Sequence, residues 1–470
     1  MRLALIYSDY THKSFEEDVG VVSEQFGTFP PLGLCYAAAI AEKAGHETLV
    51  VDAHAQRLTP QQVLERIRPF DPQILGFLLT TYMIHDNLSY IRFLKAETGL
   101  PVVVGNVQLE LYPHETMSYP EIDYGIIGSA QPVLPALLDA LERGGPVPEL
   151  PGLCLRRNGE LIVNQPATLC EDFATLPFPK RDGLPHELYH SVMTRRHNVT
   201  AMITAKGCPG GCTFCHIHRT PYSYRDPQGV CDEIEQCIER HSIREFEIFD
   251  PSFTINRERI VQICDEIVRR GLDLDFAVRA RVDQVDPGLL AKMAAAGCQR
   301  LLYGIESGSE QQLARVQKGI SLKQVRDTVS ATRDAGIEAL GFFLIGSQDE
   351  TLDEVAQTVR FARSLGLDYA QFHRTMPKPR TVLHEIVTEQ LGFDYWREYT
   401  LGNQPERRLP SPWTELSQEQ IEHETFRAYR RFYVRPSFVM RKLLGIRSLD
   451  EFARYARGGL GLLLAKSDLQ

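Results

Sequence analysis

Short apolar runs alternate with helical stretches over residues 1–150 of the chain. In order, the apolar runs are RLALIYS, ETLVVDA, ILGFLLT, PVVVG and DYGIIG, and stretches such as LGLCYAAAIAEKAG separate them. This alternation predicts an α/β domain with a parallel, doubly wound, Rossmann-like sheet. Ligands of such sheets lie beyond the carboxyl ends of the strands, so residues 8–10, 52–54, 80–82 and 105–107 form the candidate contact loops.

Three more segments follow along the chain. Residues 151–195 contain several prolines and a hairpin pattern, LCLRRNGELIV, and they are interpreted as a connector. Residues 196–383 contain a second alternating series, and six strand–helix units predict a partial (β/α)6 barrel of the TIM type. Its expected strands are VTAMITA, EFEIFD, DFAVRA, RLLYGIES, IEALGFFLIG and YAQFHRT. Residues 384–470 become helical and aromatic, which predicts a small C-terminal helical domain.

The charge balance and the spacing of the cysteines exclude some classes of protein. The 51 basic and 61 acidic residues give a net charge of -10 without a lysine or arginine run, which argues against nucleic-acid binding. A small-molecule, lipid or peptide substrate is expected instead. Only three of the ten cysteines are closely spaced, so the pattern does not resemble a disulfide framework and favours a reducing cytoplasm. The sequence shows neither a signal-peptide pattern nor an apolar run long enough to span a bilayer.

The closely spaced cysteines follow the first expected barrel strand. Cys208, Cys212 and Cys215 have the spacing C-x3-C-x2-C. Three thiolates on one loop can bind three irons of a [4Fe-4S] cluster and leave the fourth iron open for an exchangeable ligand. A structural zinc site normally needs a fourth ligand from a second pair, and the sequence offers no matching pair. Glycines in the loop let the backbone wrap closely around the cluster; they are Gly207, Gly210 and Gly211.

With this motif the chain resembles the radical S-adenosylmethionine (SAM) superfamily. Other segments match that family in order, each at the carboxyl end of an expected strand: 250–254 (DPSFT), 279–281 (RAR), 304–308 (GIESG) and 344–346 (LIG). The resemblance implies that the open iron holds the amino and carboxyl groups of SAM. One-electron reduction would then cleave SAM to a 5'-deoxyadenosyl radical.

These segments supply the candidate SAM contacts. An arginine can bind the methionine carboxylate in a bidentate manner, and a glutamate can accept from its ammonium group or from the ribose, which favours Arg279, Arg281 and Glu306. Ordinary salt bridges in a polar barrel mouth are the alternative for all three. Further candidates implied by the resemblance or by their place in the motifs are Ser252, Thr254, Ile345 and Phe214, the last of which could pack on adenine or shield the cluster.

The N-terminal region resembles the cobalamin-binding domain of the B12-dependent branch of this superfamily. The resemblance rests on 30–34 (PPLGL), 76–77 with Thr80, and 122–128 (IDYGIIG), and extends through the connector to 432–436 (FYVRP). It implies cobalamin contacts from Asp52, Thr80, Gly105 and Gly128. Two segments depart from the family pattern: 105–108 reads GNVQ where many relatives have GGxH, and 128–131 reads GSAQ where many have GEGE.

A histidine ligand to cobalt is not expected from this domain. Asp52-Ala53-His54 resembles the start of a DxHxxG motif, but it follows the second strand instead of the first, and position 57 is arginine. His12 follows the first strand with the wrong spacing. We therefore predict cobalamin bound base-off, with His54 in a surface or loop role.

The resemblance implies a cobalamin-dependent radical SAM enzyme that methylates an unactivated carbon, with an electron donor such as flavodoxin or ferredoxin. Cyclisation or oxidative rearrangement with the same cofactors, as in anaerobic ring-forming enzymes, is the first alternative. A tRNA methylthiotransferase would need a second cysteine-bound cluster in the N-terminal domain, where only Cys35 precedes Cys154. A non-catalytic cobalamin sensor is the alternative from a different class.

Overall fold

The computed structural model describes residues 1–9, 27–166, 172–196, 198–403, 411–445 and 455–456. The described residues form two compact units. The first contains strands β1 to β7 with their helices and also the short helix α16, which comes from much later in the chain. The second contains β8 to β15, α9 to α15, α17 and α18. His12 lies outside the described residues.

The first unit is built on a seven-stranded sheet with the order β2-β1-β3-β4-β5-β6-β7. The five strands from β2 to β5 in this order are parallel, as the alternating pattern predicts, and β6 and β7 are antiparallel additions. The hairpin interpreted as part of a connector thus extends this sheet. The strands are β1 (Arg2–Tyr7), β2 (Glu47–Asp52), β3 (Ile74–Leu78), β4 (Val102–Gly105), β5 (Tyr124–Ile126), β6 (Leu153–Arg157) and β7 (Glu160–Val163).

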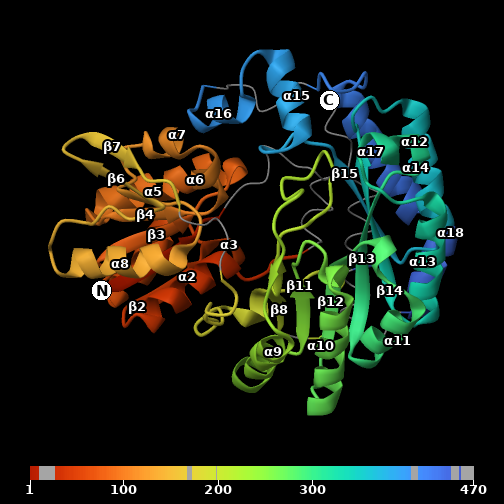
Figure 1. Cartoon of the computed structure of the whole chain (residues 1–470), viewed down its shortest axis with the longest axis horizontal. Helices are drawn as coiled ribbons and strands as arrows, with labels where there is room; N and C mark the ends of the chain where they lie inside the picture. The colour runs from red at the N-terminus through yellow and green to blue at the C-terminus, as the bar shows by residue number, and fades with distance from the viewer. Residues whose placement is uncertain (10–26, 167–171, 197, 404–410, 446–454, 457–470) are drawn as a thin grey trace. The chain divides into compact units, whose positions relative to one another are not determined.

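Helices cover both faces of this sheet (Figure 1). Helix α2 packs against α8 on one side, and α4 packs against α5 on the other, which is the doubly wound arrangement. The α-helices of this unit are α2 (Leu32–Lys43), α3 (Ala53–Gln56), α4 (Pro60–Ile67), α5 (Ile84–Thr98), α6 (Val107–Leu111), α7 (Pro113–Met117), α8 (Ala130–Glu142) and α16 (Tyr395–Thr400). From β1 the strand order continues to β2 on one side and to β3 on the other, so the sheet has its topological switch point between β1 and β3. Such folds bind ligands at the carboxyl ends of these two strands.

The second unit is a half-barrel of six parallel strands in the order β15-β14-β13-β12-β11-β8. All six expected barrel strands are present, which confirms the partial-barrel prediction. They are β8 (Val199–Met202), β11 (Glu245–Ile248), β12 (Asp275–Ala280), β13 (Cys298–Glu306), β14 (Glu338–Ile345) and β15 (Tyr369–Arg374). A separate antiparallel pair, β9 (Ala205–Lys206) and β10 (Ser223–Tyr224), follows β8.

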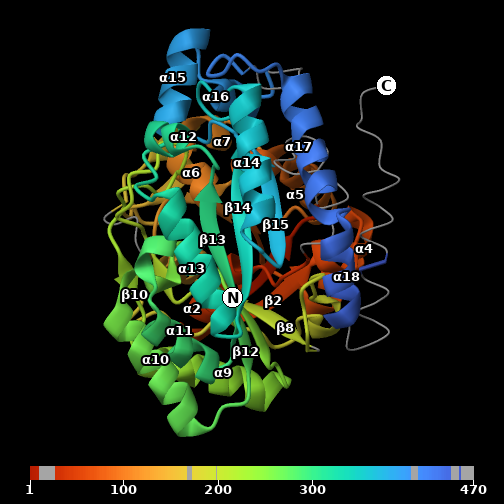
Figure 2. The same ribbon diagram turned by 90° about the vertical axis from the view of Figure 1, so that its right-hand side faces the viewer.

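Helices pack on the outer face of the half-barrel, and α10 shows why they form there. Its apolar side chains recur at helical spacing from Ile260 to Ile267 and are buried, Asn256 caps its first turn, and Gly271 ends it in a left-handed conformation. Helix α17 lies along α14 and β15 (Figure 2). The helices are α9 (Pro227–His241), α10 (Arg257–Arg270), α11 (Pro287–Ala295), α12 (Glu310–Arg315), α13 (Leu322–Asp334), α14 (Leu352–Ser364), α15 (Val382–Leu391), α17 (Gln418–Tyr433) and α18 (Pro436–Gly445).

Candidate functional site

The three-cysteine loop is closed at its base by backbone pairing. Strands β9 and β10 flank the loop, and Gly207, the residue directly after β9, has a φ of 82°. A Cβ atom on Gly207 would lie 1.8 Å from the carbonyl oxygen of Pro221, so no other residue fits this position without moving the loop. The side chain of Asp250 accepts hydrogen bonds from the N–H groups of Thr204 and Ala205 and thereby fixes the chain just before the loop.

The cysteine side chains fit a three-thiolate cluster site. Cys212 is buried, and Cys208 and Cys215 are half-buried. The N–H of Gly210 points at Cys208 Sγ at 3.4 Å, a contact that favours the thiolate, and a Cβ at residue 210 would crowd that sulfur at 3.3 Å. The N–H of Cys208 donates to Thr220 Oγ1 at 3.0 Å, which ties the two ends of the loop together.

Positive charge lies close to these thiols. Burial raises the pKa of Cys212, and Lys318 and Arg281 act in the opposite direction. Lys318 Nζ forms a buried ion pair with Glu306 at 2.7 Å, and the guanidinium of Arg281 donates to the Lys318 carbonyl at 2.9 Å. Arg281 also lies near the loop, because its Nη1 would be 3.8 Å from a Cβ on Gly210. The structure therefore brings two predicted SAM contacts, Arg281 and Glu306, together beside the cysteine loop through Lys318.

Glu306 is held in an unusual backbone conformation. Its φ is 71°, and the pairing of β13 with β14 shifts register between Gly304 and Glu306. A non-glycine residue in the left-handed region costs free energy, and within a strand the surrounding structure must stabilise it. The irregularity turns the Glu306 carboxylate toward Lys318.

Arg279 occupies a different position. Its guanidinium lies 4.4 Å from the ring centroid of Phe249, and the neighbouring charged groups are Glu247, on the adjacent strand β11, and Asp250. Burial lowers the pKa of Arg279, and Glu247 opposes that effect. Arg279 therefore does not share the Arg281–Lys318–Glu306 contacts, and its assignment as a SAM contact stays a prediction.

The remaining candidate SAM contacts of the second unit are two hydroxyl residues and two apolar residues. Ser252 Oγ donates to Gln284 Oε1 at 2.7 Å and Thr254 Oγ1 donates to the same atom at 3.2 Å, and both residues are buried. Ile345 is fully buried at the end of β14, and Phe214 is half-buried between Cys212 and Cys215. The hydroxyls of Ser252 and Thr254 therefore already form hydrogen bonds to Gln284 within the protein.

A buried carboxylate shapes the turn after Ile345. Glu350 Oε2 accepts hydrogen bonds from the N–H groups of Gly346 at 2.7 Å and Ser347 at 3.0 Å, while its buried Oε1 has no hydrogen-bond partner in the described part of the chain. Burial raises the pKa of Glu350 to about 7, and the two backbone N–H groups only partly oppose this. Its protonated form is therefore favoured in the folded chain.

This raised pKa predicts a pH-dependent stability. Because the folded pKa exceeds the ordinary value of 4.5, the stabilising contribution of protonated Glu350 is complete below pH 4.5 and is lost as the pH rises through about 7. Relative to Glu350→Gln, the parent should lose about 3 kcal/mol of unfolding free energy across this range. Urea unfolding of both proteins at pH 5.5 and pH 8 should show about 2 kcal/mol of this loss, because pH 5.5 already lies above the unfolded pKa. An unchanged gap between parent and variant at the two pH values would contradict the prediction.

In the first unit, the candidate cobalamin contacts lie at the carboxyl ends of the parallel strands. A Cβ atom on Gly105 would meet nothing closer than 3.8 Å, and its φ is not positive, so packing within the unit does not require glycine there. A ligand that approaches the backbone closely would explain it, which fits a corrin site. The Thr80 hydroxyl makes no hydrogen bond to a described residue, whereas Gly128 needs its glycine for a φ of 77°.

Asp52 and His54 are engaged within the unit. Asp52 is buried, accepts from the N–H of Ala55 at 2.9 Å as the N-cap of α3, and accepts from the Tyr189 hydroxyl at 3.0 Å. Nδ1 of His54 lies 3.0 Å from Asp9 Oδ1. Arg57, which stands where the DxHxxG motif has glycine, takes a left-handed conformation with a φ of 51°.

His54 provides a direct test of the cobalt ligand. A carboxylate on one imidazole nitrogen is also the arrangement that orients metal-ligating histidines, so the Asp9 contact alone does not decide the role of His54. From its position in the sequence, we expect His54→Ala to leave the visible spectrum and the affinity of bound cobalamin nearly unchanged. Loss of a nitrogen hyperfine signal from cob(II)alamin in the variant would show that His54 is the axial ligand.

A segment from far along the chain completes the first unit. Helix α16 packs on loops that follow β3 and β4: the ring of Trp396 lies edge-on to Tyr82 at 5.0 Å, and His85 Nε2 contacts the Tyr399 carbonyl at 2.7 Å. Gln108 stands where many relatives have histidine, and its amide donates to Thr400 Oγ1 at 3.0 Å. This departure from the family pattern thus holds α16 in place.

Several functional residues escaped the sequence interpretation. Lys318, Gln284 and Thr220 all contact candidate site residues, yet each lies outside the motifs at the strand ends. Lys318 lies in the segment RVQKGI, which gives no local signal of a functional role. Nothing in the sequence near α16 indicates that it packs against residues about 300 positions earlier, as the His85 contact does with a separation of 314.

Comparison with known proteins agrees with this geometry. The family model of the radical SAM superfamily matches residues 202–362, and that of the B12 binding domain matches residues 19–138. An uncharacterized methyltransferase from Pyrococcus horikoshii is 31% identical over 423 residues, which cover 88% of this chain and 90% of the relative. The chain belongs to the cobalamin-dependent radical SAM enzymes. The cofactors of this family are a [4Fe-4S] cluster, SAM and cobalamin, as the sequence predicted, and membership disfavours the non-catalytic sensor.

Two further relatives of this radical SAM enzyme bear on its chemistry. The anaerobic magnesium-protoporphyrin IX monomethyl ester cyclase of Rubrivivax gelatinosus is 24% identical, over 89% of this chain and 76% of the relative. The solved structure of the radical SAM methyltransferase TsrM from Kitasatospora setae matches with a TM-score of 0.67 and 21% identity. That match covers 83% of this chain and 76% of TsrM, and it confirms the fold.

Proposed function

We propose that this radical SAM enzyme methylates an unactivated carbon of a small-molecule, lipid or peptide substrate. The observation that carries the proposal is the relationship to a methyltransferase over nearly the whole length of both chains. When bound, the cluster supplies the electron that cleaves SAM to a 5'-deoxyadenosyl radical, and cobalamin supplies the methyl group. The chain's own residues bind and orient these groups, and the roles proposed for them follow from the contacts described above.

In the second unit, Cys208, Cys212 and Cys215 would ligate the cluster. Arg281 and Glu306 would bind the methionine part of SAM, with Lys318 holding the Glu306 carboxylate in place. This assignment is supported by the position of the ion pair beside the loop, where a charged cosubstrate can exchange with the existing contacts. The other candidate SAM contacts, which lie outside the Arg281–Lys318–Glu306 contacts, are Ser252, Thr254, Arg279, Ile345 and Phe214.

In the first unit, the strand ends would bind cobalamin. Gly105 leaves its backbone open to a corrin, and Thr80 offers, at the switch point, a hydroxyl that makes no hydrogen bond to any described residue. Gly128 shapes the loop before α8, where Ser129 accepts from the N–H of Gln131 as the helix N-cap. Asp52 would act by fixing α3 instead of through direct contact, because both of its oxygens already accept hydrogen bonds.

Radical cyclisation without methyl transfer is the second candidate, because a relative over 89% of the chain is named as a cyclase. SAM with a deuterated methyl group distinguishes the two. The purified holoenzyme, reduced anaerobically with an extract of its source organism, should transfer the label to a product that has gained one carbon. A product that has lost hydrogens and carries no label would favour cyclisation, and absence of 5'-deoxyadenosine would contradict both candidates.

Partners and location follow from the same chemistry. We propose a flavodoxin or ferredoxin as electron donor, because reduction of the cluster requires a one-electron protein donor, and a cytoplasmic location. In the part of the chain that the structure describes, no helix is both long enough and apolar enough to cross a membrane. The described cysteines outside the loop are buried free thiols, which is consistent with a reducing compartment; they are Cys35, Cys154, Cys231, Cys237, Cys264 and Cys298.

A further inference from the structure

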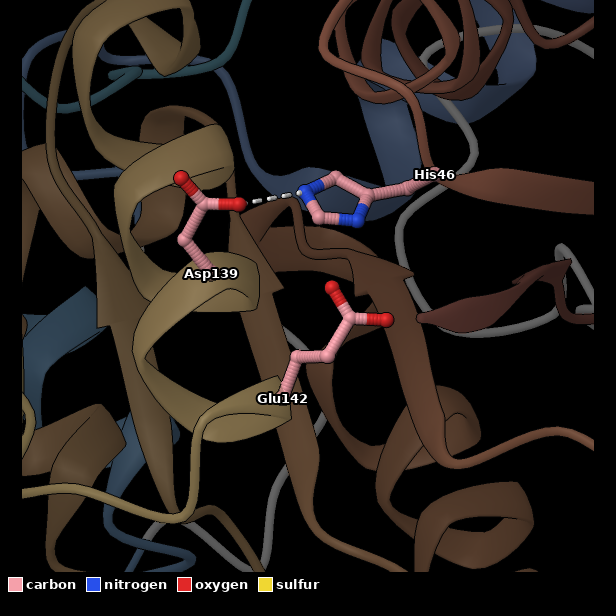
Figure 3. A group of neighbouring side chains, drawn as sticks. All are labelled: His46, Asp139 and Glu142. Atoms are coloured by element: carbon pink, nitrogen blue, oxygen red, sulfur yellow. Dashed lines mark ion pairs between the residues drawn. The ribbon is translucent and has the colours of Figure 1, made fainter.

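A second group of ligand-type side chains lies in the first unit, at the sheet edge opposite the proposed cobalamin contacts. His46 directly precedes β2, whereas Asp52 ends it. The six residues of β2 separate the two positions by about 20 Å. His46 meets Asp139 and Glu142, which lie one turn apart on α8 (Figure 3). This cluster is therefore distinct from the corrin site.

The imidazole of His46 is buried, and one of its two nitrogens lacks a hydrogen bond to a described residue. Only 5% of the residue is exposed, and its Nε2 has no hydrogen-bond partner among the residues that the structure describes. Nε2 faces Asp139 Oδ1 at 3.5 Å, which is longer than a hydrogen bond to a carboxylate (Figure 3). A buried nitrogen without a partner is uncommon in folded proteins and calls for a ligand or an ion.

Asp139 faces this nitrogen, and Glu142 lies close to the same imidazole ring. One ligand atom from each of His46, Asp139 and Glu142 can be chosen so that all three lie within 4.8 Å of one another. Asp139 uses its other oxygen, Oδ2, to pair with Arg143 at 3.2 Å, which leaves Oδ1 toward His46. On the far side of the ring, the amino group of Met1 contacts His46 Nδ1 at 3.1 Å and Glu142 Oε1 at 2.7 Å.

We propose that His46, Asp139 and Glu142 bind a divalent transition-metal cation, with Zn²⁺ as the best fit. A tetrahedral zinc ion with nitrogen and oxygen ligands at about 2.0–2.2 Å places neighbouring ligand atoms about 3.4 Å apart. The distance from His46 Nε2 to Asp139 Oδ1 already matches, and the half-exposed Glu142 side chain can rotate to complete the site. Imidazole selects zinc over magnesium or calcium, which prefer oxygen ligands throughout.

Such an ion would join the start of β2 to the end of α8. These elements are far apart in sequence and lie at one edge of the sheet, so the ion would stabilise the first unit without taking part in the radical chemistry. Binding requires Nε2 to present its lone pair, so Nδ1 carries the ring proton in the metal-bound form and no longer accepts from the Met1 amino group. Glu142 can keep its contact with Met1 through the second carboxylate oxygen.

Calorimetric titration of the anaerobic full-length holoenzyme with zinc chloride tests the proposal. Loading with iron–sulfur cluster and cobalamin beforehand removes the loop thiols as competing zinc ligands. The parent should bind one equivalent, and His46→Gln and Asp139→Asn should each weaken that binding at least tenfold. Zinc should raise the unfolding temperature of the parent and leave that of both variants unchanged, and magnesium should not compete.

Matched variants control for general effects of the substitutions. Glu47→Gln removes an exposed carboxylate next to His46, and His114→Gln removes an exposed histidine elsewhere in the same unit. Both should bind zinc like the parent. If His46→Gln does not fold, Asp139→Asn decides, because Asp139 lies on a helix surface with its side chain 47% exposed. Zinc binding of equal affinity in the parent and in Asp139→Asn would overturn the proposal, as would a zinc anomalous signal located away from His46.

Discussion

Replacing Cys208, Cys212 and Cys215 with alanine is expected to remove all cluster iron and abolish SAM cleavage while cobalamin stays bound. The loop offers three thiols and no fourth protein ligand is needed for the open iron, so loss of all three leaves nothing to hold the cluster. The proposed cobalamin contacts lie in a unit with its own sheet, so the affinity of that unit for cobalamin should be retained. Iron analysis, visible spectra and detection of 5'-deoxyadenosine measure the three outcomes.

A matched control separates the loop thiols from thiols in general. Cys231→Ala removes a fully buried thiol on α9 in the same unit, and this variant should keep both the cluster and the cleavage activity. Loss of cobalamin together with iron in the triple variant would contradict the division of cofactors between the units. Retained iron would show that the loop is not the cluster site.

The second large effect is expected at Glu306, which pairs with Lys318, and at the neighbouring Arg281, beside the cysteine loop. Glu306→Gln and Arg281→Lys should each raise the dissociation constant of SAM about tenfold or more with normal cluster content, because a charge-assisted contact contributes about 1.5–3 kcal/mol. Lysine reproduces a bidentate arginine contact poorly, so the lysine in Arg281→Lys should not substitute for the arginine in SAM binding. Equilibrium binding of SAM to the cluster-loaded, unreduced protein measures the change.

The local structure sharpens the interpretation of these variants. Glu306→Gln leaves Lys318 buried without its carboxylate, so cluster content and unfolding temperature must be measured beside SAM affinity. Arg257→Lys, in an exposed ion pair with Asp286 on the same unit, is the control and should bind SAM like the parent. Arg279→Lys tests the remaining arginine. If Glu306→Gln, Arg281→Lys and Arg279→Lys all bind SAM normally, the three side chains are structural.

Much of the fold was accessible from the sequence because its determinants are local. A run such as ETLVVDA has too many β-branched and apolar residues in too short a span to be anything but a buried strand, and it forms β2. The amphipathic spacing and caps of α10 are likewise properties of one segment. The cysteine loop was predicted for the same reason, since its three thiols and its glycines lie within nine residues, 207–215.

Contacts that depend on distant segments were decided only by the tertiary structure. The sequence indicated charged groups at Arg281 and Glu306, but the left-handed backbone at Glu306 and the buried partner Lys318 arise from the pairing of β13 with β14 and the return of the chain after α12. The sequence likewise gave no reason to separate Arg279 from Arg281. In the structure Arg279 lies within β12, whereas Arg281 follows its last residue, and the two guanidinium groups meet different partners.

The sequence by itself determined the alternation of strands and helices, the two alternating regions and the three-thiol motif, since each is specified by the order of side chains within one short segment. The tertiary structure decided that the hairpin β6–β7 extends the first sheet, that α16 completes the first unit, and that His46 meets Asp139 and Glu142. In each of these cases the free energy comes from burial and hydrogen bonding between segments far apart in the chain, which leave no periodic signal in either segment alone.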